Sequence, residues 1–138
     1  GFTGAIRGTI YKAIWTNVML TRWNDSTAFY RPQWQSRNEI GIRTNWLSRF
    51  PSGNFGVNAA FLYEYQSGNR FPAADSSVLT PISVGGFHVV STRVEFRLLN
   101  AVLSYQFRNM WGEPYQVVPF FLMPRRIQFY GVRWEFWN

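Results

Sequence analysis

Apolar and polar residues alternate with a period of two along most of this chain, and the spacing typical of amphipathic helices is nearly absent. Successive side chains of a strand point to opposite faces of its sheet, so this alternation predicts strands with one apolar and one polar face. About six strands are predicted, over residues 4–23, 36–50, 55–65, 90–98, 101–108 and 127–138. The first is the longest, and no turn signal splits it convincingly.

The predicted connections alternate in length. Residues 51–54 and 99–100 form short turns, whereas residues 24–35, 66–89 and 109–126 form long loops rich in Pro, Gly, Asn and Ser. A compact soluble domain seldom contains loops this long. Strict sorting of short and long connections is typical of a transmembrane β-barrel, with short turns in the periplasm and long loops outside. The pattern therefore predicts an all-β fold, an antiparallel transmembrane β-barrel segment of about six strands that is part of a larger barrel.

The composition supports lipid as the neighbour of the apolar faces. Aromatic residues make up 20% of the 138 residues and charged residues only 15%, against about 25% charged in a typical soluble domain. No apolar run approaches the roughly 18 residues of a membrane helix, which excludes a helical membrane protein. The length suits a single domain, residues 1–138.

The chain carries a net charge of +7, and every basic residue except Lys12 is an arginine. A basic chain suggests nucleic acid, but these arginines are spaced along strands instead of forming one patch, which argues against a nucleic-acid partner. Glutamates lie on the same strand faces, so we expect charge pairs lining the lumen of a barrel. The residues predicted to form this lumen-facing polar surface are Arg37, Glu39, Arg43, Glu64, Arg93, Glu95, Arg97, Arg133 and Glu135.

No residue pattern supports catalysis, a cofactor or a metal centre. The chain has no Cys, and its only histidine, His88, lacks nearby ligand residues. The seven acids are scattered, and Gly85-Gly86 lacks the strand-loop-helix context of a phosphate loop. We therefore expect a protein that is not an enzyme.

The aromatic residues allow two interpretations. Strand tryptophans such as Trp23, Trp134 and Trp137 fit girdles at the membrane interfaces better than a carbohydrate platform. Aromatic residues in the loops are candidate ligand contacts, namely Trp34, Phe71, Trp111, Tyr115, Phe120 and Phe121.

The last strand resembles the assembly signal of bacterial outer-membrane barrels, in which a glycine is followed by alternating aromatic residues. Gly131, Trp134 and Phe136 match this pattern, whereas Phe129 replaces the usual polar residue and Trp137-Asn138 extend past the last aromatic. More widely, residues 93–138 resemble the end of TonB-dependent outer-membrane receptors, with the Leu99-Asn100-Ala101 turn, Ser104-Tyr-Gln-Phe-Arg-Asn109 and Met123-Pro-Arg125. The rest of the chain resembles them only by pattern.

The resemblance implies a location in the bacterial outer membrane and uptake of a scarce nutrient, such as a siderophore, cobalamin, glycan or peptide. It also implies partners: outer-membrane lipid, the remainder of the barrel or other barrel chains, a plug domain and the TonB system. Gly1 is not an initiator Met, so we expect a processed chain or a fragment, the C-terminal part of the barrel domain.

Two alternatives stay open. One is a soluble, aromatic-rich β-sandwich that binds carbohydrate. The other is a structural outer-membrane assembly component whose strands complete the sheet of another chain.

Overall fold

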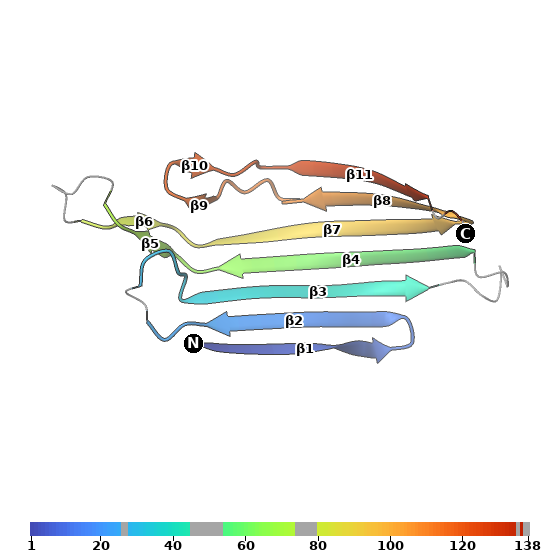
Figure 1. Ribbon diagram of the computed structural model, residues 1–138, viewed down its shortest axis with the longest axis horizontal. Coiled ribbons are helices and arrows are strands. Elements are labelled where there is room, and N and C mark those ends of the chain that lie inside the picture. Colours follow the sequence, from blue (N-terminus) through green and yellow to red (C-terminus); the bar gives the residue numbers. More distant parts are fainter. Residues whose placement is uncertain (26–27, 45–53, 74–79, 135, 137–138) are drawn as a thin grey trace.

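The computed structural model describes residues 1–25, 28–44, 54–73, 80–134 and 136. Its main feature is one antiparallel sheet of seven strands in the order β1-β2-β3-β4-β7-β8-β11 (Figure 1). The strands are β1 (Phe2–Tyr11), β2 (Ile14–Arg22), β3 (Trp34–Thr44), β4 (Phe55–Gln66), β7 (Phe87–Leu98), β8 (Ala101–Arg108) and β11 (Ile127–Trp134). The sheet is open, and within the described residues β1 and β11 each pair with one strand only.

The predicted all-β antiparallel class is confirmed, but the main sheet has seven strands where about six were predicted. The difference lies in residues 4–23, which form the hairpin β1-β2 and not one long strand. The chain reverses at Lys12-Ala13, where Lys12 adopts a positive φ of 43°. This turn contains no Gly, Pro or Asn, so the usual signals of a hairpin loop are missing.

Two of the predicted long loops contain short hairpins. In residues 66–89, β5 (Asn69–Phe71) pairs with β6 (Ile82–Val84), and β7 begins at Phe87. In residues 109–126, β9 (Gln116–Val118) pairs with β10 (Phe121–Leu122). The predicted end of the second strand and most of the turn at 51–54 lie outside the described residues.

The connections are sorted between the two ends of the sheet (Figure 1). The two-residue turns at 12–13 and 99–100 lie at one end, and the hairpins β5-β6 and β9-β10 extend from the other. The newly found turn at 12–13 precedes the long connection 23–33, so it continues the predicted alternation of short and long. No helix among the described residues is long and apolar enough to cross a membrane.

The two faces of the sheet reverse the usual relation between polarity and burial. On the apolar face Phe61 is 58% exposed and Tyr130 is 76% exposed. The buried strand residues Ala60, Leu62 and Val89 lie instead on the face that carries the charges. Long polar side chains cover these small and aliphatic residues, and the aromatic face has no cover within the described residues.

The exposed area of the chain is large for its mass. The total is 9947 Å², whereas a compact monomer of 16.2 kDa exposes about 7,500 Å². The exposed large hydrophobic side chains include many on one sheet face, such as Ile6, Ile40 and Phe61. A surface of this kind is typical of a protein that meets another molecule or a membrane there.

Candidate functional site: the charged face of the sheet

Strand register brings the charged side chains together on one face. One continuous row of paired residues crosses five strands, namely Arg7, Asn17, Glu39, Leu62 and Ser91. We call this surface the polar face. Its described charged members are Arg7, Arg37, Arg43, Arg93, Arg97, Arg108 and Arg133, with Glu39, Glu64 and Glu95.

All the predicted polar-surface residues that the structure describes therefore share this face, and Glu135 lies outside the described residues. Arg7 and Arg108 belong to the same face but were not among the predicted residues. Both alternate in phase with their strands, so the period-two pattern contained the signal.

Two glutamates in the half of the polar face nearer the long loops are held by arginines. The Nη2 of Arg93 donates to Oε1 of Glu39 at 2.8 Å. Glu64 lies between Arg37 and Arg108, at 3.8 and 3.7 Å. The Arg93–Glu39 pair is the shortest and the most sheltered of these contacts, since the Glu39 side chain is only 12% exposed. It ties β7 to β3 across the intervening β4.

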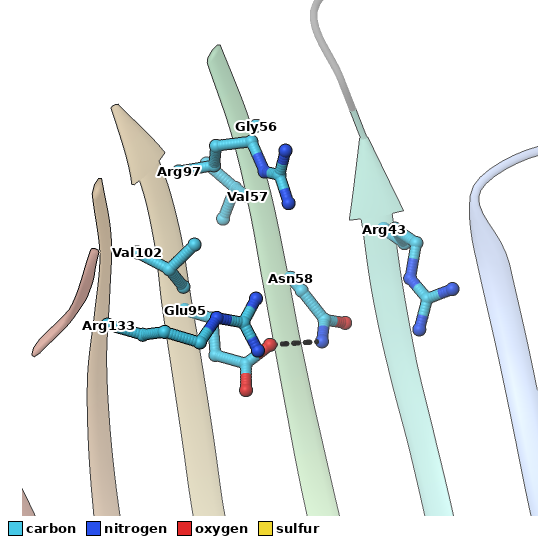
Figure 2. Close-up of a pocket in the computed structure, with 8 residues that line it drawn as sticks. All are labelled: Arg43, Gly56, Val57, Asn58, Glu95, Arg97, Val102 and Arg133. Carbon is cyan, nitrogen blue, oxygen red and sulfur yellow. Dashed lines mark hydrogen bonds between the residues drawn. The ribbon is translucent and has the colours of Figure 1, made fainter. Parts of the chain in front are cut away.

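The third glutamate lies toward the end of the sheet that carries the turns at 12–13 and 99–100, which we call the short-turn end. Glu95 on β7 accepts a hydrogen bond of 2.9 Å from Nδ2 of Asn58 on β4. Figure 2 shows this pair between Arg133, on β11, and Arg43, on β3, with Arg97, on β7, above it in the view. The arginines line a hollow of about 380 Å³, with Gly56, Asn58, Glu95 and Val102.

Trp15 also lies on the polar face. Its ring covers Gly41, where an added Cβ would lie 2.6 Å from Cζ2 of Trp15. The guanidinium carbon of Arg43 is 6.0 Å from the centre of the same ring, within the range of a cation–π contact.

The polar face also holds buried polar atoms that make no hydrogen bond to the described residues. They are Nε1 of Trp15, Oδ1 of Asn58, and Nε of Arg93 and Arg108. Buried polar groups normally find a partner, in the protein or in ordered water. All four atoms lie on the polar face.

The loop aromatics divide into structural and exposed residues. Phe71 and Tyr115 are buried, Phe71 against Tyr30 with ring centres 5.4 Å apart and Tyr115 against Phe87 at 4.6 Å. Trp34 packs 4.9 Å from the guanidinium of Arg22. Trp111, Phe120 and Phe121 are exposed. Of the six candidate loop aromatics, these three are therefore the exposed ones. His88 makes an edge contact with Trp111, with ring centres 5.8 Å apart.

The residues of the predicted assembly signal lie at the edge strand β11. An added Cβ at Gly131 would lie 2.5 Å from Oγ of Ser104 on β8, so a larger residue there would require the Ser104 hydroxyl to rotate away. Trp134 ends β11 on the apolar face opposite Ala101, and Phe136 is 83% exposed.

Comparisons with known proteins do not assign the chain to a family. No family model matches it, and no curated protein or solved structure was found to match.

Proposed function

We propose that this chain forms part of the wall of an outer-membrane β-barrel, in a receptor of the TonB-dependent kind that takes up a scarce nutrient. The observation that carries the proposal is the arrangement of the two sheet faces. Aromatic residues are exposed on one face, and charged pairs lie on the other. A strand in a membrane barrel has its apolar side chains toward lipid and its polar side chains toward a wet lumen. Phe61 and Tyr130 would contact lipid, and Arg93 and Glu39 would line the lumen.

The two edges of the sheet support the same proposal. Backbone groups at an open edge are not tolerated in lipid, so a membrane sheet closes into a barrel. The smallest single-chain membrane barrels have about eight strands, more than the seven of this sheet. Further strands, from a longer chain or from other chains, would pair with β1 and β11.

The receptor assignment rests on the resemblance of residues 93–138 to the end of TonB-dependent receptors. The plug domain, the TonB system and the nutrient are expectations from that resemblance. The polar face suits a passage for polar solutes, and the described residues bring no nucleophile and base together there.

The proposal is tested by the behaviour of the folded chain in detergent. We expect it to be extracted with outer-membrane proteins and to migrate differently on gels before and after boiling, because closed membrane barrels resist unfolding by detergent at room temperature. The measurement is gel mobility of heated and unheated samples of the membrane fraction.

Recovery as a soluble monomer without detergent would contradict the proposal and favour the β-sandwich. That fold would have to cover the aromatic face with a second apolar layer, and no such layer exists among the described residues.

A further inference from the structure

We propose that the short-turn end of the polar face binds organic anions that carry two or more carboxylate or phosphate groups. The site is the hollow lined by Arg43, Arg97 and Arg133, which we call the arginine hollow (Figure 2). The inference that this hollow binds anions is argued from the arrangement of residues on the main sheet. Only the step from binding to transport rests on the proposed function.

The donors suit carboxylate and phosphate. A guanidinium presents five N–H groups in a planar fork that matches two oxygens of either group at once. Arg97 and Arg133 have interactions with other groups of the chain, so the inference depends on their charge and number of donors and not on their being unoccupied. Three such groups surround one hollow, and its described lining contains a single carboxylate, that of Glu95.

The charge balance of the arginine hollow is positive. Glu95 is the only acidic residue among its described lining residues, and one of its oxygens already accepts from Asn58 at 2.9 Å. Among the described lining residues, arginines outnumber acids three to one. The remaining positive charge favours an anion.

The spacing of the strands favours a ligand with more than one anionic group. Arg97 and Arg133 lie on β7 and β11, which are separated by β8. Two strand spacings correspond to about 10 Å between the two backbones. An anion with several groups can contact long arginine side chains from both strands at once. The volume of about 380 Å³ falls within the range of small-molecule sites, about 300–1,000 Å³.

Calorimetric titration of the folded full chain, in the detergent in which it is stable, tests the inference. Citrate and pyrophosphate are the probes, and acetate at equal ionic strength is the reference. We expect citrate and pyrophosphate to bind at least about tenfold more tightly than acetate, since each bidentate arginine contact adds charge-assisted hydrogen bonds. The double variant R97Q/R133Q should lose most of this preference.

Two further variants separate a built site from general attraction to a basic surface. Arg133→Lys keeps the charge but loses the planar fork, so its affinity should lie between those of the wild type and Arg133→Gln. Arg7→Gln removes one charge from the same face, on β1 and away from the arginine hollow, and should leave binding unchanged. Equal binding of acetate and citrate, or equal losses in Arg7→Gln and Arg133→Gln, would overturn the inference.

The two proposals fail separately. Heat-modifiable, detergent-extracted protein that does not prefer citrate or pyrophosphate would refute only the anion site. A soluble protein that binds them through Arg97 and Arg133 would refute only the membrane proposal.

Discussion

At the scale of single residues, Gly41 shows how closely the polar face is packed. An added Cβ there would lie 2.6 Å from the ring of Trp15 and 2.7 Å from the carbonyl oxygen of Ala59. The backbone oxygen cannot move without disturbing the pairing of β3 with β4. Gly8, in β1, has no atom within 4 Å of the same position, so the two glycines form a matched pair.

We predict that Gly41→Ala lowers the free energy of unfolding by about 1–3 kcal/mol, the usual cost of overpacking. Gly8→Ala should be neutral or slightly stabilising, because alanine restricts the unfolded chain and meets nothing in the sheet. Urea unfolding of the two variants, followed by tryptophan fluorescence, measures the difference. Equal effects of both substitutions would show that Trp15 does not pack on Gly41.

The contact between Trp15 and Gly41 could not be predicted from the sequence. The alternation places Trp15 on the mixed face of its strand, but its neighbour on β3 depends on the register Trp15↔Gly41. That register depends on the long connection 23–33 between β2 and β3, which has no regular turn pattern from which it could be read.

At the scale of elements, the hairpin β1-β2 was hidden by a bulge. In most of this hairpin, even-numbered residues of β1 pair with even-numbered residues of β2, from Phe2↔Arg22 to Thr9↔Trp15. The register shifts by one residue between Thr9 and Tyr11. The extra residue keeps Ile6, Ile10, Ile14 and Val18 in one alternating series across the turn. The pattern thus predicts the faces of both strands correctly while concealing that there are two. The short hairpins β5-β6 and β9-β10 were missed because strands of two or three residues contain too few positions to show a period.

The apolar face of β4 gives a prediction that separates membrane from water. Phe61 lies near the middle of the strand and is 58% exposed. If lipid covers it, Phe61→Arg should cost about 2–4 kcal/mol of stability in bilayers, because a charge on the lipid face near the midplane must be desolvated. In a soluble protein the same exposed position should tolerate arginine within about 0.5 kcal/mol.

Denaturant unfolding of the protein in lipid vesicles measures this cost. Gln35→Arg, on the polar face of β3, is the control and should change stability little in either environment. A negligible effect of Phe61→Arg would argue against contact with lipid.

At the scale of the whole molecule, the sequence predicts the class of fold and the sorting of connections, because both depend on period and length. It does not predict whether the sheet closes. Closure depends on curvature and on partners for β1 and β11, and neither is contained in the alternation of single strands. The polar residues meet on one face because paired residues on neighbouring strands point to the same side of the sheet, so each strand's alternation continues across the next. Which arginine pairs with which glutamate, such as Arg93 with Glu39, follows only from the three-dimensional arrangement.

Assembly provides a test at this scale. We predict that Trp134→Asp and Phe136→Asp each abolish membrane assembly, because they place a charge in the terminal segment on its apolar side. The precursor level should stay unchanged. The measurement is the amount of heat-modifiable protein in the outer-membrane fraction, with Arg133→Gln on the opposite face as control. Normal assembly of both aspartate variants would refute the role of this segment as a signal.

The order of strands in the main sheet has a further consequence for folding kinetics. Every strand pairs with the main-sheet strand that precedes or follows it in the chain. Each pairing therefore requires the closure of only one connection. The entropic cost of closing a connection grows only slowly with its length. The sheet can therefore grow by adding one hairpin at a time, with no strand inserted between two that are already paired. Its slowest closures should be those of the long connections 67–86 and 109–126, where loop entropy is greatest.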